Sequence, residues 1–159
     1  MKRQTGFSLV ELLIVLAVAA IIAAIAVPSM IGLINGSRVS STAEVLTNDL
    51  VAARLDAIRY RRQYTVCAAS SPNTATACSN NANGWGGGWI VLNSTGVVSR
   101  HTANQGLTMV GTTGSVVYSP VLGGTSNATT LCFSKGTEIR RVIVLTTGRV
   151  TRSTGGAAC

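Results

Sequence analysis

Hydrophobic and polar positions divide the chain into three parts. Residues 7–27 form an apolar run of 21 residues whose only charged side chain is Glu11. That length matches the ~20 residues with which a helix crosses the hydrocarbon core of a membrane. Lys2 and Arg3 precede the run, and basic residues at this position predict a cytoplasmic N-terminus with the remainder of the chain exported.

The second part, residues 29–62, has the period of an amphipathic helix. Its apolar residues recur at spacings of four and three and form one stripe: Val39, Ala43, Leu46, Leu50, Ala53 and Ala57. We therefore expect the helix to continue out of the membrane, with a kink or local melting at Pro28, Gly32 and Gly36. Cations suit the C-terminal end of the helix dipole, and four arginines are expected to close the helix: Arg54, Arg59, Arg61 and Arg62.

The third part, residues 63–159, alternates short β-type runs with turns rich in Gly, Ser, Asn and Thr. Strands are predicted at residues 63–68, 89–93, 97–100, 107–110, 116–119, 130–134, 139–146 and 149–153. A long helix followed by an antiparallel meander gives an α+β domain, with the apolar stripe of the helix packed on one face of the sheet.

Composition argues against an ordinary soluble enzyme. Of the 159 residues, 47% are hydrophobic but only 11% are charged, well below the ~25% of an average soluble domain. His101 is the only histidine of the exported part, so this part has few side chains that could form a catalytic dyad. The glycine-rich segment 83–91 fails as a phosphate-binding GxGxxG loop because Trp89 stands where the third glycine would be. We expect no enzymatic activity and no cofactor, and core or rim packing for Trp85 and Trp89.

All four cysteines lie in the exported part, as in a protein of an oxidising compartment. Four cysteines allow three pairings. We expect Cys67 with Cys78, which closes the polar segment 70–83, and Cys132 with Cys159, which ties the C-terminus to the sheet. A metal site is disfavoured, since the chain has no CxxC pair and one histidine.

A cleaved secretory signal is the rival interpretation of the N-terminus. The basic start, the apolar stretch and Ala24-Ile25-Ala26 as a small-x-small site fit it. Glu11 argues against it, because a carboxylate in the membrane costs about 2.5–3.5 kcal/mol at the bilayer centre and less near an end. From these residues alone, the two interpretations stay open.

Residues 6–13, Gly-Phe-Ser-Leu-Val-Glu-Leu-Leu, follow a short basic leader and precede an apolar helix with Pro28. This arrangement resembles the class III signal of type IV pilins and type II secretion pseudopilins. The resemblance implies a pilin fold with residues 1–6 as leader, 7–28 as the helix of membrane and filament core, 29–62 as the amphipathic half of the helix, and 63–159 as the β-rich domain. It also implies that a prepilin peptidase cleaves between Gly6 and Phe7 and methylates the Phe7 amine, while the inner membrane retains the helix and the globular domain lies in the periplasm.

A physical role for Glu11 follows from the resemblance. In a filament of bundled helices, its carboxylate could pair with the Phe7 ammonium of a neighbouring subunit, because the two groups lie four residues apart in sequence. A buried charge without a partner is costly, so the pair would favour one axial stagger. The alternative role is local: negative charge is favoured at any helix N-terminus.

The second half resembles the GspH/FimT family of minor pilins and minor pseudopilins. The likeness rests on residues 88–91 (Gly-Trp-Ile-Val), 131–133 (Leu-Cys-Phe), 141–144 (Arg-Val-Ile-Val) and 148–152 (Gly-Arg-Val-Thr-Arg). Some FimT-like members are associated with DNA capture through a GRxR element, which implies double-stranded DNA as a partner. Here the arginines stand three apart, so Arg149 and Arg152 would face opposite sides of a regular strand unless a bulge or turn restores a common direction.

Charge is compatible with that partner. The formal net charge is +8, and Glu138 is the only acidic residue after residue 66. This excess of positive charge suits contact with phosphate. The candidate DNA-binding residues are Arg149 and Arg152, with further support from Arg140, Arg141 and Lys135. A solvated basic surface without a ligand is the alternative.

Three functions therefore stay open on sequence grounds. The first is a minor type IV pilin, at low copy or at the pilus tip, with non-specific DNA binding for DNA uptake in natural transformation. The second is a structural priming or adhesive minor pilin, or a minor pseudopilin of the type II secretion system, with other pilins or pseudopilins as partners. The third is a periplasmic binding domain with a cleaved signal.

Overall fold

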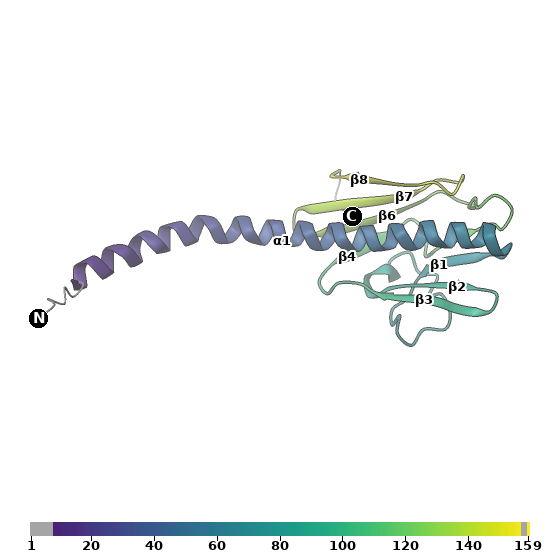
Figure 1. Ribbon diagram of the computed structural model, residues 1–159, viewed down its shortest axis with the longest axis horizontal. Helices are drawn as coiled ribbons and strands as arrows, with labels where there is room; N and C mark the ends of the chain where they lie inside the picture. Colours follow the sequence, from purple (N-terminus) through teal and green to yellow (C-terminus); the bar gives the residue numbers. More distant parts are fainter. Residues whose placement is uncertain (1–7, 157–158) are drawn as a thin grey trace, which may run out of the picture. The chain divides into compact units, whose positions relative to one another are not determined.

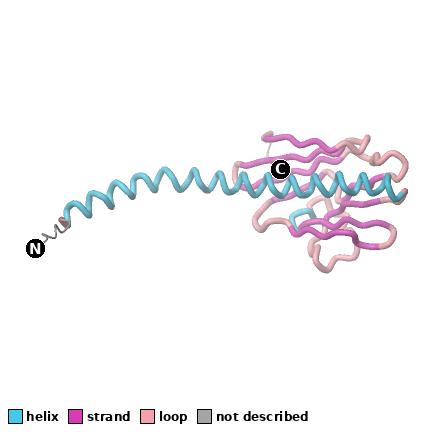
Figure 2. The backbone as a smooth tube through the Cα atoms, in the orientation of Figure 1, coloured by secondary structure: helices cyan, strands magenta, loops and turns pink. Residues whose placement is uncertain are grey.

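The computed structural model describes residues 8–156 and 159. One helix, α1 (Leu9–Tyr60), precedes eight strands among the described residues (Figures 1 and 2). The strands are β1 (Tyr64–Ala68), β2 (Gly88–Asn93), β3 (Gly96–Thr102), β4 (Thr108–Gly111), β5 (Ser115–Tyr118), β6 (Thr129–Lys135), β7 (Glu138–Val144) and β8 (Val150–Thr154). A 3-10 helix, η1 (Gly84–Gly87), leads into β2. The chain forms two compact units, one ending at Ile34 and the other running from Asn35 to Cys159.

Helix α1 passes without interruption through Pro28, Gly32 and Gly36, so the expected local melting is wrong. Pro28 removes one backbone donor and crowds the carbonyl four residues before it, but the surrounding turns keep the helical path. The helix ends at Tyr60 because Arg61 adopts a left-handed φ of 51°. The amide of Arg62 then donates to the carbonyl of Ala57 at 3.2 Å, which satisfies one of the last helical carbonyls.

Each predicted strand corresponds to a strand of the structure, but the expected single meander is wrong. The described strands form two antiparallel four-stranded sheets, with the orders β3-β2-β1-β5 and β4-β6-β7-β8. The chain changes sheet between β3 and β4, between β4 and β5, and between β5 and β6. Between β4 and β5, Thr112 N–H donates to Thr130 O of β6, while Gly114 O accepts from Ala68 N–H of β1, both at 2.9 Å.

The predicted stripe of α1 is buried along its whole length: Val39, Ala43, Leu46, Leu50, Ala53 and Ala57. It belongs to one hydrophobic core with residues of both sheets, among them Trp89 of the first and Phe133 of the second. Burial of a side chain such as Leu46 or Leu50 contributes about 1.5–3 kcal/mol. The stripe therefore holds the two sheets to the same helix, rather than packing on one sheet face as expected.

Candidate functional site

The N-terminal unit presents apolar side chains to its surroundings. Every described residue from 8 to 31 is exposed, and α1 is long and apolar enough, by length and composition, to cross a membrane. Exposed apolar surface of this extent requires lipid or protein around it. Glu11 lies in the first turn of α1 and is the only charged residue of the helix before Arg38. The expected cleavage residues Gly6 and Phe7 lie outside the described part of the chain.

The two central candidates for DNA contact, Arg149 and Arg152, do not share a face. Arg152 is opposite Val142 in the β7–β8 register, and Val142 is fully buried in the core, so the side chain of Arg152 is on the helix side of the sheet. Arg149 precedes β8, where its carbonyl accepts from Leu145 N–H at 2.9 Å. Because Val144 pairs with Val150 without a register shift, Arg149 is on the opposite side.

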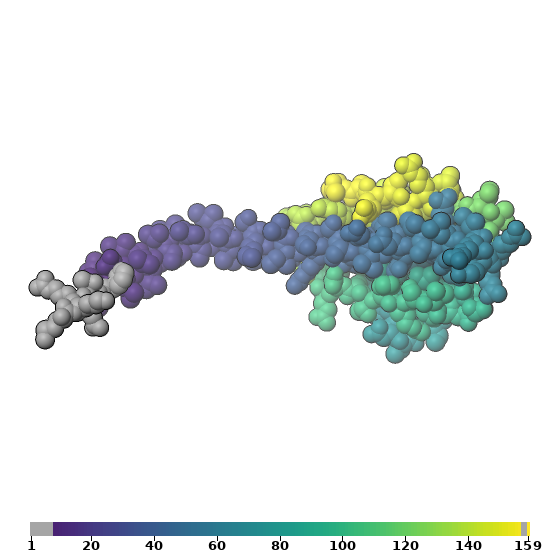
Figure 3. All heavy atoms as spheres, in the orientation of Figure 1, coloured from purple at the N-terminus to yellow at the C-terminus, as the bar shows by residue number. Residues whose placement is uncertain are grey.

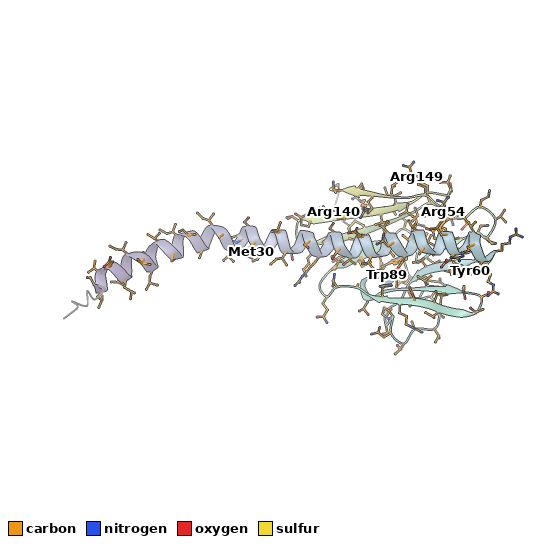
Figure 4. All side chains as sticks on the ribbon, viewed as in Figure 1. Met30, Arg54, Tyr60, Trp89, Arg140 and Arg149 are labelled. Carbon is orange, nitrogen blue, oxygen red and sulfur yellow. A yellow bond between two sulfur atoms is a disulfide. The ribbon has the colours of Figure 1, made fainter. Side chains whose placement is uncertain are left out.

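Arg140, two residues from Val142, shares the helix side with Arg152. Both line a groove of about 560 Å³ between α1 and the β7–β8 hairpin. The other groove residues are small or hydroxylated, apart from one further arginine: Ser40, Ala43, Arg141, Ser153 and Thr154. Figure 4 shows Arg140 and Arg149 at opposite ends of the hairpin. The register therefore pairs Arg152 with Arg140 instead of Arg149.

The supporting candidates, Arg140, Arg141 and Lys135, bind acceptors within their own chain. Arg140 forms an ion pair with Glu138 at 3.7 Å, and its Nη1 donates to Ile139 O at 3.0 Å. Arg141 Nη1 donates to Gly155 O at 3.0 Å, and Lys135 Nζ donates to Gln105 O at 3.2 Å. Within residues 8–156 and 159, Arg149 and Arg152 have no such partner, and both are exposed.

The structure joins Cys67 to Cys78 and Cys132 to Cys159, the two pairings expected from the sequence. The first bridge folds the segment 70–83 over the outer face of the first sheet, where Cys67, Ala69 and Ile90 form a small second core. The second bridge ties the C-terminus to β6. Both tryptophans are buried, as expected.

Sequence reasoning missed a polar cluster beside the core. Oδ2 of Asp49 accepts a hydrogen bond from Trp89 Nε1 at 2.6 Å and lies 3.2 Å from His101 Nε2. The His101 ring stacks on Trp89 with centroids 5.4 Å apart. The available signal was an acidic residue directly before Leu50 of the buried stripe, which predicts a carboxylate near the core but not its partners.

The role of Arg54 was also missed. Instead of neutralising the helix end, its Nε donates to Gly123 O at 3.1 Å and its Nη2 donates to Thr147 O at 3.0 Å. These acceptors lie 69 and 93 residues away in the sequence, so local sequence carries no signal for them. Arg54 thus fastens the β5–β6 and β7–β8 connections to α1.

Comparison with known proteins connects this arrangement to a family. Residues 42–148, about two thirds of the chain, match the family model of the type II transport protein GspH. The chain belongs to the GspH family. Residues 1–27 match the prokaryotic N-terminal methylation motif. The GspH match ends directly before Arg149, so it does not include the two arginines of the predicted DNA-binding element.

Two solved structures share the fold of this GspH-family chain. The type IV minor pilin FimU of Pseudomonas aeruginosa is similar with a TM-score of 0.58 at 19% identity, over 74% of this chain and 89% of FimU. The minor pseudopilin EpsH of the type 2 secretion system of Vibrio cholerae has a TM-score of 0.53 at 14% identity, over 76% of this chain and 99% of EpsH. No curated protein matches the sequence. The predicted pilin fold, with a long N-terminal helix packed on an antiparallel β domain, is confirmed.

Proposed function

We propose that the chain is a minor pilin, assembled at low copy in a type IV pilus or at its tip. One observation carries the proposal: an exposed apolar helix with a single carboxylate in its first turn continues into a helix whose stripe is buried in a folded domain. Such a subunit can be anchored in the inner membrane by its apolar helix, which can then pack against the apolar helices of other subunits. The named relatives, a minor pilin and a minor pseudopilin, support this class of function.

Maturation belongs to the same proposal. A prepilin peptidase would cleave between Gly6 and Phe7 on the cytoplasmic side, with the globular domain in the periplasm, in keeping with the methylation motif and the two disulfides. A minor pseudopilin of the type II secretion system, or a structural priming or adhesive pilin, is the alternative. The similarity to EpsH favours the pseudopilin among these.

Filament fractionation tests the proposal. Sheared surface filaments and membranes are compared in wild-type cells and in cells without the assembly ATPase of the pilus or of the secretion system. We expect the chain in the filament fraction of wild-type cells. Its absence from that fraction in one of the two ATPase mutants identifies whether the filament is the pilus or the pseudopilus. A soluble periplasmic chain beginning at Val27 would contradict the proposal and restore the cleaved signal peptide.

Non-specific DNA binding is a second candidate function, supported by the groove in which Arg152 and Arg140 meet hydroxyl side chains. A guanidinium donates paired hydrogen bonds to phosphate oxygens and stays charged at any relevant pH. Because Arg152 has no partner in the described structure and Arg140 holds Glu138, we assign Arg152 the leading role. Arg149 would contact phosphate separately, with Arg141 and Lys135 contributing charge.

Three matched variants of the full chain in detergent micelles test DNA binding: Arg152→Gln, Arg149→Gln and, as control, Arg62→Gln at the helix end. Each removes one exposed charge. We expect Arg152→Gln to weaken binding to every duplex sequence alike and to lower the slope of log affinity against log salt by about 0.9, the value for one phosphate. Equal losses in all three variants would reduce the binding to net charge and favour the purely structural pilin or pseudopilin.

A further inference from the structure

An exposed apolar surface lies where the C-terminal end of α1 meets the β5–β6 connection. Val121 and Leu122 of that connection are 77% and 78% exposed, and Val51, Leu55 and Ile58 of α1 are also exposed. The backbone of Gly123 packs against the Ile58 side chain and joins the two groups. We call these five apolar residues the end patch. Figure 3 shows the connection, in green, against the blue end of the helix.

The end patch is held in place by the rest of the domain. Arg54 binds the carbonyls of Gly123 and Thr147, so one side chain fixes both connections to α1. Gly123 and Gly148 have φ angles of 62° and 77°, which favour glycine. A Cβ on Gly148 would overlap Gly123 O, so the two turns are packed directly together. A preformed surface loses little conformational entropy when it binds.

Exposed apolar patches on a folded domain mark sites of interaction. The two exposed aliphatic side chains of this connection contribute nothing to the core, and solvation of such side chains is unfavourable. Burial of one of them against a partner would contribute about 1.5–3 kcal/mol before the costs of association. Because the end patch is both exposed and held in place, it is suited to bind a partner.

The charge around the end patch specifies the partner. Arg59, Arg61 and Arg62 are exposed at the end of the helix, while Asp56 is the only acid of its last two turns. A complementary surface is apolar at its centre and acidic at its rim.

A second copy of this chain is poorly suited to supply that rim. The chain has five acids in total. Glu11 lies in the apolar unit, Asp49 binds Trp89 and His101, and Glu138 pairs with Arg140. Only Glu44 and Asp56 are left, and Asp56 lies on the basic surface itself. The complementary surface therefore belongs to a different chain.

We propose that the end patch binds another subunit of the same filament, a different polypeptide whose contact surface is apolar with an acidic rim. This inference rests on the proposed function, because it takes the partner from among the filament subunits. It adds which surface of the domain makes the contact and that the contact is heterotypic.

Photo-crosslinking in cells tests the inference on the full chain. p-Benzoylphenylalanine replaces Leu122, and in a matched control it replaces Val98, an exposed apolar residue of β3 outside the end patch. We expect Leu122 to give an adduct whose peptides come from another chain with an N-terminal methylation motif, at least fivefold above the Val98 control. Charge reversal by Arg59→Glu should lower the adduct severalfold, whereas Arg38→Glu, an equal change in charge at an exposed position of α1 outside the end patch, should not.

An adduct only with a second copy of this chain, only with lipid or DNA, or at the level of the Val98 control would overturn the inference. Filament fractionation of the same cells separates it from the proposed function. If the chain is present in filaments but Leu122 gives no heterotypic adduct, only the end patch proposal fails, and absence from filaments would contradict the minor-pilin proposal itself.

Discussion

Asp49 and Trp89 connect helix α1 to the first sheet through one short hydrogen bond, from Trp89 Nε1 to Asp49 Oδ2 at 2.6 Å. Trp89 is 1% exposed, so its indole N–H is out of reach of bulk water. A charged acceptor makes such a bond stronger than a bond between neutral groups. The contact therefore fixes the position of α1 across the strand β2, in addition to the apolar stripe.

Removal of the carboxylate should be costly. We expect Asp49→Ala to lower the free energy of unfolding by about 1–3 kcal/mol, because it leaves the buried indole N–H without an acceptor. Urea unfolding of the full chain in detergent micelles, followed by tryptophan fluorescence, measures the change. The control is Asp56→Ala, which lies on the same helix without a side-chain bond in the described structure. Equal stability of the two variants would contradict the structural role of Asp49.

Tyr118 gives a prediction about alkaline pH. Its side chain is fully buried, and its hydroxyl has no hydrogen-bond partner among the described residues. Burial raises the pKa of the Tyr118 phenol far above its usual value, although the positive charge of Arg54 opposes the shift. The unfolded state therefore loses this proton first, so the contribution of Tyr118 to stability is complete below about pH 10 and decreases above it by about 1.4 kcal/mol per pH unit.

The variant Tyr118→Phe removes this dependence. At pH 7 we expect it to be neutral or stabilising, since it deletes a buried hydroxyl that has no partner. At pH 11 it should be more stable than the wild type by about 1.4 kcal/mol beyond any difference at pH 7. Urea unfolding at the two pH values decides the matter, and parallel losses of stability in both proteins would contradict the raised pKa.

Local patterns account for what the sequence could predict of this fold. The stripe from Val39 to Ala57 and the eight β-type runs are expressed by neighbouring residues, and each became the expected element. The division into two sheets was not predictable in the same way. It depends on which strands pair across long sequence separations, such as β1 with β5 and β4 with β6.

The candidate site was also predictable only where its signals are local in the sequence. Glu11 and the methylation motif are local signals, and residues 1–27 match the prokaryotic N-terminal methylation motif. The relation of Arg149 to Arg152 depended on strand register, which the sequence left open between a bulge and a regular strand. Pairing of Val144 with Val150 decided it, because core burial of Val142 and Val144 fixes the face of every residue on β8.

The disulfides give a prediction about redox state. We expect no free thiol in the native protein before reduction, and peptide mapping should recover the bridges Cys67–Cys78 and Cys132–Cys159. In the chain-entropy account, the bridges with separations of 11 and 27 residues contribute about 2.8 and about 3.6 kcal/mol respectively. Replacement of each pair by alanine measures these contributions. Native thiols that react with an alkylating reagent would overturn the prediction of an oxidised domain.

The N-terminus of the mature chain provides a direct test of maturation. We expect the mature protein to begin with N-methyl-Phe7, because residues 1–27 match the methylation motif. Intact-mass measurement of the chain from membranes distinguishes this form from the unprocessed precursor. In cells without the prepilin peptidase, the mass should return to that of the full chain. A methylated mass that does not depend on the peptidase would contradict this route.

Glu11 should matter for assembly and not for membrane insertion. The cost of a carboxylate in the membrane disappears in Glu11→Ala, so the variant should insert as well as the wild type or better. In the filament, the change would leave the neighbouring Phe7 ammonium buried without a partner, which costs about 3–5 kcal/mol where burial is complete. Since 1.4 kcal/mol is a factor of ten in an equilibrium, recovery in sheared filaments should decrease more than tenfold.

Two further variants separate charge from shape at this position. Glu11→Gln keeps the size of the side chain and removes its charge, so it should fail like Glu11→Ala if pairing with an ammonium is the cause. Val10→Ala shortens the adjacent residue without a change of charge and should assemble normally. The ratio of filament to membrane protein, measured by immunoblot in cells with equal expression, gives the comparison. If Glu11→Gln assembles as well as Val10→Ala, the carboxylate is not needed for its charge, and the stagger of the subunits must be set by the apolar surfaces of the helix.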